Sequence, residues 1–212
     1  MKYDTLAPAF IERGTNGIAL VSANSLLQER RVLFLLNPID QSEVAQVIQQ
    51  IIILNAKSDK PITIVIGSPG GDIQQGLALL DVMSSSRCII RTISVGLAAS
   101  MASVILAAGT PGYRFCTEHS RVMLHEPLLA NGIGGSCSSI QEAAKHILER
   151  KELINGLLSR FTKRSIEEIE TATAYDHFYS AEEAMEFGLV DRVAGSDILM
   201  ELLGGVTDDD LS

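Results

Sequence analysis

Residues 62–71 read Ile-Thr-Ile-Val-Ile-Gly-Ser-Pro-Gly-Gly. The first five are all β-branched and lie between Pro61 and Gly67, so they predict a short buried strand. The next four, Ser68-Pro69-Gly70-Gly71, predict a tight turn. Apolar side chains then recur at helical spacing, at Ile73, Leu77, Leu80 and Met83. A strand that turns directly into a helix is a unit from which parallel sheets are built.

The same alternation continues on both sides of this segment. Residues 31–36 and 89–95 are apolar runs that predict two more strands, and residues 121–124 predict a third member of this series. A helix is expected across positions 44–52, with Asp40 and Glu43 as a capping box, and another from about Ser100 to about Gly109. Alternating strands and helices predict an α/β fold with right-handed crossovers and a mostly parallel sheet.

The C-terminal third has a different pattern. Apolar residues at helical spacing predict one helix of about 25 residues, from Ser138 to Phe161, which exceeds the usual length of about 8–20. Such a helix is expected to project from the domain and pack on something else, such as another subunit. Capping-box patterns open two shorter helices, at Ser165 with Glu168 and at Ser180 with Glu183. Gly188 is expected to end the second of these, and residues 189–190 to form a last short strand. Residues 1–30 give only weak strand signals.

Length and composition set the class of protein. A chain of 212 residues that is 46% hydrophobic predicts a single domain, residues 1–212, with a sizeable core. The net charge of −9 argues against nucleic acid or an anionic membrane as a partner. The longest apolar stretch, residues 95–109, is shorter than the roughly 20 residues of a membrane span. The charged start, residues 1–13, is unlike a secretory signal.

Cysteine usage points to a reducing compartment. The three cysteines are Cys88, Cys116 and Cys137, an odd number without a CxxC spacing. They are expected to be reduced thiols in a cytoplasmic protein. No His/Cys spacing fits a zinc site, so no metal is expected.

The segment Gly96-Leu97-Ala98-Ala99-Ser100-Met101 lies where an apolar run is expected to become a helix. Ser100 has two readings there: an ordinary helix N-cap, or a nucleophile that a base must activate. Unpaired backbone N–H groups at a helix start, such as that of Met101, could stabilise an oxyanion. The pair Gly70-Gly71 could supply a second N–H donor, because ligands of parallel sheets bind beyond the carboxyl ends of strands. A simple tight turn explains these glycines equally well.

A base and an orienting carboxylate are also available. His125 ends the apolar run 122–124, where a rigid strand could aim it. Asp176 lies between two predicted helices, near no obvious cap position. Serine, histidine and aspartate that meet in a pocket form an acyl-transfer triad, whatever their order in the chain. Spacing alone leaves other candidates open: His119, His146 and His177 for the base, and Asp72, Asp81 and Asp191 for the carboxylate.

Four motifs, in this order, resemble those of the ClpP family, the proteolytic subunits of the Clp protease. They are residues 68–71, residues 96–101, the run Ser120-Arg-Val-Met-Leu-His-x-Pro127, and the run from Asp176 to Asp191. The resemblance extends from about residue 26 to 193 and implies a serine peptidase with the ClpP/crotonase-like fold. It implies that Ser100 is the nucleophile, His125 the general base and Asp176 the residue that orients it. The oxyanion donors would be the N–H groups of Gly71 and Met101.

The resemblance also implies an assembly. Family members stack two seven-subunit rings into a closed chamber, where unfolded proteins are cut to short peptides. AAA+ unfoldases feed the chamber using ATP, so no cofactor is expected in this chain. Residues 1–25 would form an axial segment, residues 126–161 a handle of a strand and the long helix between the rings, and residues 200–212 a flexible acidic tail.

Three departures from the family pattern leave alternatives open. Residues 134–138 read Gly-Gly-Ser-Cys-Ser where most members have Gly-Gln-Ala-Thr-Asp, and Tyr175 replaces an arginine of an inter-ring ion pair. Residues 18–22 lack the usual tyrosines. One alternative is therefore a weakly active or structural ring partner that needs a second ClpP. Another is a crotonase-like acyl-CoA enzyme, which shares the fold but uses other acid–base residues.

Overall fold

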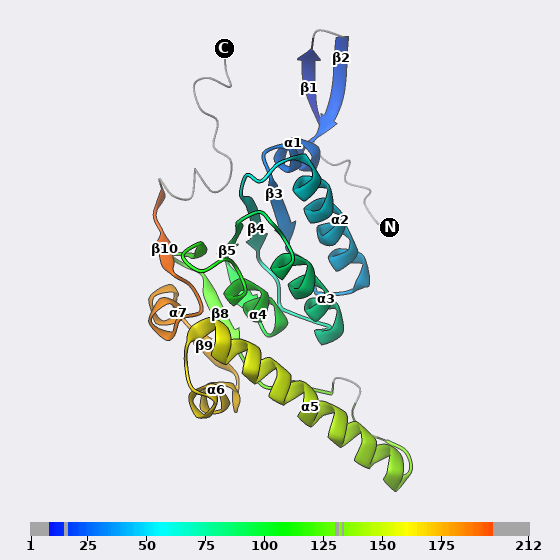
Figure 1. The fold of residues 1–212 in the computed structure, drawn as a ribbon, viewed down its shortest axis with the longest axis vertical. Coiled ribbons are helices and arrows are strands. Elements are labelled where there is room, and N and C mark those ends of the chain that lie inside the picture. The colour runs from blue at the N-terminus through cyan, green and yellow to red at the C-terminus, as the bar shows by residue number, and fades with distance from the viewer. Residues whose placement is uncertain (1–8, 15–16, 130–131, 133, 197–212) are drawn as a thin grey trace, which may run out of the picture.

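The computed structural model describes residues 9–14, 17–129, 132 and 134–196. Its centre is a five-stranded sheet in the order β10-β7-β5-β4-β3, and every neighbouring pair is parallel (Figure 1). The strands are β3 (Val32–Leu35), β4 (Ile62–Ile66), β5 (Ile90–Ser94), β7 (Arg114–Thr117) and β10 (Arg192–Ala194). The expected α/β fold with a mostly parallel sheet is confirmed.

Two helices directly follow strands of this sheet, α2 (Gln41–Lys57) after β3 and α3 (Ile73–Ser84) after β4, and α4 (Met101–Ala107) lies farther along the chain after β5. They pack with Ile62, Ile64 and Ile66 in the main core, whereas Val65 points to a smaller cluster on the other face. All five residues of β4 are buried, which explains why its boundaries match the predicted strand. The helices carry the apolar face that the sequence spacing predicts, since Leu80 and Met83 of α3 are buried.

A separate three-stranded sheet corrects one prediction. Residues 121–124 form β8 (Arg121–Leu124), but they do not join the five-stranded sheet. Instead β8 pairs in parallel with β6 (Leu97–Ala99) and antiparallel with β9 (His177–Tyr179). The chain leaves β5 through Gly96, whose φ of +79° favours glycine, and Arg121 N–H then donates to Gly96 O at 2.7 Å. This turn separates β6 and its partners from the main sheet.

The long helix, α5 (Cys137–Thr162), has the length that the sequence predicts and projects from the body of the molecule (Figure 1). Its buried residues, Ile154, Asn155, Leu158 and Thr162, all lie in its C-terminal half. The described residues between β8 and α5, namely 125–129, 132 and 134–136, have no regular secondary structure in this single chain. A strand in the predicted handle would need a neighbouring strand to pair with.

Two short helices, α6 (Ile166–Thr173) and α7 (Ala181–Phe187), begin with the predicted capping boxes. Gly188 ends α7 with a φ of +94°, as expected. The capping box at Asp40 is only half formed, because Glu43 accepts hydrogen bonds from Asn37 instead of reaching back to Asp40. Residues 189–190 are buried in the core but form no strand, and that prediction is wrong.

The N-terminal part is more regular than its sequence indicates. An antiparallel hairpin of β1 (Ala9–Gly14) and β2 (Gly17–Ser22) is followed by α1 (Ala23–Glu29). The predicted acidic tail, residues 200–212, lies outside the described residues. Within the described part of the chain, no helix combines the length and apolar character needed to cross a membrane.

Arg114 and Asp191 tie several elements together. Asp191 Oδ1 accepts from Arg114 Nη2 at 2.6 Å, and Asp191 Oδ2 accepts from the N–H groups of Gly112 and Arg114. Arg114 Nη1 also donates to the carbonyl oxygens of Phe161 and Gly188, at 3.1 and 3.0 Å. This buried guanidinium therefore holds the C-terminal ends of α5 and α7 against β7.

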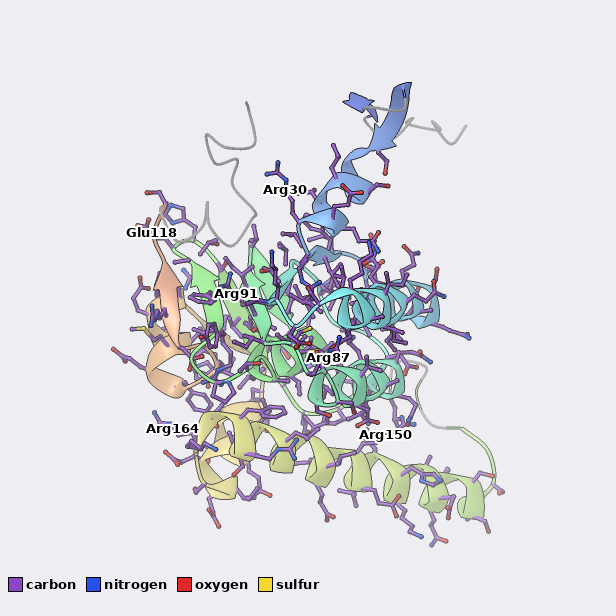
Figure 2. All side chains as sticks on the ribbon, turned by 45° about the horizontal axis from the view of Figure 1, so that its top comes forward. Arg30, Arg87, Arg91, Glu118, Arg150 and Arg164 are labelled. Carbon is purple, nitrogen blue, oxygen red and sulfur yellow. The ribbon has the colours of Figure 1, made fainter. Side chains whose placement is uncertain are left out.

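Arg164, labelled in Figure 2, makes a second connection. Its guanidinium donates to Glu168 on α6 at 3.0 Å and to the carbonyl oxygens of Glu186 and Phe187 at 2.8 and 3.3 Å. The start of α6 and the end of α7 are therefore both fastened to the segment that follows α5.

Replacing Asp191 with asparagine should lower the free energy of unfolding by about 3–5 kcal/mol at pH 7, because it leaves the buried Arg114 without its counter-charge. Asp59→Asn is the matched control, since Asp59 pairs with the exposed Arg87 (Figure 2) and its loss should cost less than about 1 kcal/mol. Urea unfolding of the two variants measures the difference. Equal losses would contradict the structural role given to Asp191.

The same pair predicts a pH dependence. Burial alone would raise the pKa of Asp191, but hydrogen bonds from Arg114 and Gly112 outweigh it and hold the pKa below its ordinary value. Its stabilising contribution is therefore complete above the unfolded pKa of about 3.9 and is lost as the pH falls through the lower folded pKa. Acid unfolding of Asp191→Asn should lack this part of the pH dependence.

Candidate active site

Ser100 lies between the end of β6 and the first residue of α4. Its φ of 55° and ψ of −126° are rare for a residue with a side chain, and its N–H donates to Met123 O on β8 at 2.9 Å. Ser100 occupies the N-cap position of α4, but its hydroxyl makes no hydrogen bond to the helix. The interpretation of Ser100 as an ordinary side-chain N-cap is therefore wrong. Instead, Ser100 Oγ lies 2.8 Å from His125 Nε2. A strained serine that faces a histidine is typical of an activated nucleophile.

His125 is the first residue after β8, and its other ring nitrogen faces Asp176. The His125 Nδ1 to Asp176 Oδ1 distance is 3.3 Å, and the side chains are 16% and 66% exposed, respectively. In a neutral imidazole, Nδ1–H can donate to this carboxylate while Nε2 accepts the serine proton. The distance is longer than the roughly 2.8 Å of a strong charge-assisted hydrogen bond. Water therefore competes with His125 for the exposed carboxylate of Asp176. Asp176 binds His125 less strongly than a buried carboxylate would.

The other histidines are occupied elsewhere or remote from the serine. His146 is on the surface of α5, within 3.3 Å of Glu142 and Glu149. His177 stacks on Tyr179, with 4.2 Å between the ring centroids, and His119 is exposed in the loop before β8. The structure therefore brings only His125 of the described histidines within hydrogen-bond distance of Ser100.

The other candidate carboxylates, Asp72, Asp81 and Asp191, are placed differently. Asp72 caps α3 by accepting from Gln75 N–H at 2.9 Å, and Asp191 is bound by Arg114. Asp81 is exposed on α3. None of the three is paired with a histidine in the described part of the chain, whereas Asp176 is.

Gly70 lies against Ser100 in the turn that follows β4, and Gly71 lies against Ile39. A Cβ atom on Gly70 would lie 2.7 Å from Ser100 Cβ and 3.1 Å from Met101 N, so only glycine allows this approach. Ile39 N–H donates to Gly70 O, and Asp72 N–H donates to Ile39 O, at 2.9 and 2.8 Å. In this parallel bridge the N–H of Gly71 points away from Ile39.

Two N–H donors in this part of the molecule have no partner. Neither Gly71 N–H nor Met101 N–H donates a hydrogen bond to any residue that the structure describes. Met101 is the first residue of α4, so its N–H has no partner within the helix. Two unpaired donors next to a serine hydroxyl can hold the oxyanion that forms when a serine attacks a carbonyl carbon.

Ser68 has a structural role that its sequence context does not show. Ser68 is fully buried, and its hydroxyl donates to Asn37 O at 2.6 Å and accepts from Gly70 N–H at 3.2 Å. Its carbonyl accepts from Ala99 N–H at 3.0 Å, which ties the glycine turn to β6. The turn chemistry of Ser-Pro-Gly-Gly indicates a bend, but only the fold shows that it bends toward Ser100.

The residue after His125 anchors a second part of the site. Glu126 N–H donates to Thr173 O at 2.8 Å, and Glu126 Oε2 accepts from Lys151 Nζ at 2.6 Å. That hydrogen bond raises the pKa of Lys151 above its ordinary value. The base is thereby connected to the end of α6, just before Asp176, and to the long helix α5.

A small apolar pocket adjoins the serine and the histidine. Besides Ser100, Met101 and His125, its lining is Ile73, Val104, Leu124, Pro127, Ile154 and Leu158. Its volume is about 20 Å³. Larger hollows of about 280 to 550 Å³ occur elsewhere on the surface, but Ser100, His125 and Asp176 line none of those described.

Metal-ligating clusters and thiols are the other groups in the described residues that could carry chemistry. No group of three or more metal-ligating side chains comes together there. All three cysteines are free, and burial raises the pKa of Cys116 to about 12, so this thiol stays protonated at neutral pH. Among these groups, the arrangement at Ser100 is the one suited to acyl transfer.

Comparison with known protein families gives an independent result. A family model described as Clp protease matches residues 15–197, which include Ser100, His125, Asp176 and both glycines of the turn. The match covers far more than half of the chain. The chain therefore belongs to the Clp protease family.

Proposed function

We propose that this family member is a serine endopeptidase subunit that cuts unfolded proteins to short peptides. Membership of the Clp protease family makes it a peptidase of the ClpP type. The observation that carries the serine mechanism is the 2.8 Å separation of Ser100 Oγ and His125 Nε2. The N–H groups of Gly71 and Met101, which have no partner among the described residues, support it. A substrate carbonyl placed between the hydroxyl and these donors is positioned for attack.

In the proposed reaction, His125 Nε2 takes the hydroxyl proton as Ser100 Oγ bonds to the carbonyl carbon. The N–H groups of Gly71 and Met101 stabilise the negative charge on the carbonyl oxygen. His125 then gives the proton to the leaving amine, and the peptide bond breaks. Water repeats the sequence on the acyl-enzyme, which releases the new carboxyl end and restores Ser100. Asp176 orients His125 throughout.

We propose further that the subunit works in two stacked seven-membered rings fed by an ATP-driven AAA+ unfoldase, in the cytoplasm. Ring assembly and partnership with Clp unfoldases are general in the family. The exposed N-terminal half of α5, which carries the apolar side chains Ile140 and Leu148, supports contacts with another subunit. The chain itself needs no cofactor for the hydrolysis proposed here.

A second candidate is a ring partner that is active only beside another ClpP. Two observations favour it: Tyr175 is 86% exposed next to Asp176, and residues 134–136 form no strand in the single chain. A tyrosine cannot form the ion pair of the usual arginine. Peptide hydrolysis by the purified protein, alone and mixed with a second ClpP, distinguishes the two proposals, because the second predicts activity only in the mixture.

Ser100→Ala should abolish peptide hydrolysis, lowering kcat by about 10⁶-fold, because no other residue takes over the attack. A fluorophosphonate probe should label wild-type Ser100 and leave Ser100→Ala unlabelled, as read by peptide mapping. Ser103→Ala is the control, since Ser103 is a neighbouring serine whose hydroxyl donates only to Ser100 O. Unchanged hydrolysis in Ser100→Ala would contradict the proposal, and an unlabelled wild type would favour the crotonase-like alternative.

Gly71→Ala should lower kcat by about 10²–10³-fold, the usual effect of losing one oxyanion donor. Its φ is +153°, and an added Cβ would collide with the backbone of Ile39, so the N–H must move. Gly112→Ala is the control: its φ of +87° makes it comparably strained, but nothing lies within 4 Å of the added atom and it is not in the site. Steady-state kinetics on one peptide tests both, and equal effects would argue against an oxyanion role.

Asp176→Asn should lower kcat by clearly less than the ~10⁴-fold that a buried orienting carboxylate supplies in serine proteases. The reason is that Asp176 is two-thirds exposed and 3.3 Å from His125. Asp81→Asn, an exposed carboxylate remote from His125, should leave kcat unchanged. A loss of 10⁴-fold or more in Asp176→Asn would mean that the carboxylate is held more tightly than in the single chain.

A further inference from the structure

Asp176 constrains the orientation of His125 only weakly. The side chain of Asp176 is 66% exposed, and its Oδ1 lies 3.3 Å from His125 Nδ1. Ion pairs and hydrogen bonds of exposed carboxylates are weakened by water. The position of the base therefore depends on further contacts of the segment in which His125 lies.

The backbone is held at the peptide bond that His125 shares with Glu126. The N–H of this peptide bond donates to the carbonyl oxygen of Thr173, the last residue of α6, at 2.8 Å. Pro127 follows, and a residue before proline is disfavoured from a helical conformation. The backbone of His125 is thereby tied to the segment that carries Asp176, and the Glu126 side chain remains to contact another element.

That element is the long helix α5. Lys151 Nζ donates to Glu126 Oε2 at 2.6 Å, a short charge-assisted hydrogen bond. Lys151 lies one turn before Ile154, and both Ile154 and Leu158 of the same helix are buried in the main core. The ammonium group is therefore attached to a firmly packed part of α5.

The contact between Lys151 and Glu126 has little to contribute to folding. The two side chains are 33% and 41% exposed, and ion pairs at such positions add little to stability. The hydrogen bond raises the pKa of Lys151, so the pair is fully charged at neutral pH. What distinguishes this pair is its place, because Glu126 is the residue next to His125.

We propose that Lys151 and Glu126 are positioning residues for His125. Lys151 holds the Glu126 side chain, Glu126 holds the backbone after His125, and the imidazole keeps its 2.8 Å approach to Ser100 Oγ. The inference rests on the proposed peptidase function and adds two residues to its mechanism. Neither residue contacts the reacting atoms in that mechanism, so the pair should act on kcat and leave KM nearly unchanged.

The first experiment removes the charge of Lys151 in the full chain, with a second ClpP present if hydrolysis requires one. Lys151→Met should lower kcat by about 10- to 100-fold, because a small displacement of a catalytic group has effects of this size. KM should change by less than about 2-fold. Lys151→Arg keeps the cation and should stay within about 3-fold of the wild-type kcat.

Arg87→Met is the matched control. Arg87 and Asp59 form an ion pair with the same 2.6 Å separation elsewhere in the fold, so its loss should leave kcat and KM unchanged. Steady-state kinetics on one peptide compares all the variants.

A double-mutant cycle tests whether Lys151 acts through Glu126. Glu126→Ala, Lys151→Met and the double variant should all lower kcat by the same factor, because each breaks the same contact. The rate at which a fluorophosphonate probe labels Ser100 should fall in parallel, without any peptide present. The melting temperature should shift by less than about 4 °C, and native mass measurement should give the wild-type assembly.

Three outcomes overturn the positioning role while the peptidase stands. They are an unchanged kcat in Lys151→Met, additive losses in the double variant, and a loss of kcat that comes with a changed KM, melting temperature or assembly mass. If the wild-type protein neither reacts with the probe nor hydrolyses any peptide, the proposed function fails, and the positioning role fails with it.

Discussion

The pairing of β8 with β6 on one side and β9 on the other is the constraint on which the candidate site depends. Because β6 and β8 are parallel, both end at the same edge of the small sheet, and the antiparallel β9 begins there. Ser100 follows β6, His125 follows β8 and Asp176 precedes β9. Three residues that are distant in the chain thus meet because each is the next residue beyond a paired strand, and Ser100 N–H bound to Met123 O fixes the register.

The larger sheet supplies the other half of the site. Its buried strand β4 ends in the turn of Gly70 and Gly71, and Ser68 fastens this turn to β6. The small sheet therefore positions the candidate triad and the N–H of Met101, and the large sheet positions the N–H of Gly71. Arg114 holds the C-terminal end of α5, the helix whose Ile154 and Leu158 line the apolar pocket. The chemistry and the pocket thus share one rigid core.

The sequence predicts elements whose signal is local. All five residues of β4 are apolar or β-branched and buried, so the run itself defines the strand, and the capping boxes of α6 and α7 are equally local. Pairing between strands is not local. The three-residue strands β6 and β9 and the four-residue β7 escape prediction, and so does the transfer of residues 121–124 to a separate sheet. From the sequence alone, Asp191 stays a candidate for the carboxylate that orients the base, because nothing in the sequence shows that Arg114 binds it.

The most direct test of this account is a crystal structure of the protein with a peptide boronate bound. We predict a bond from Ser100 Oγ to boron, one boronate oxygen within hydrogen-bond distance of Gly71 N–H and Met101 N–H, and His125 Nε2 beside a second. A boronate bound elsewhere, or an oxygen turned away from both N–H groups, would contradict the claim that these strands assemble the catalytic site.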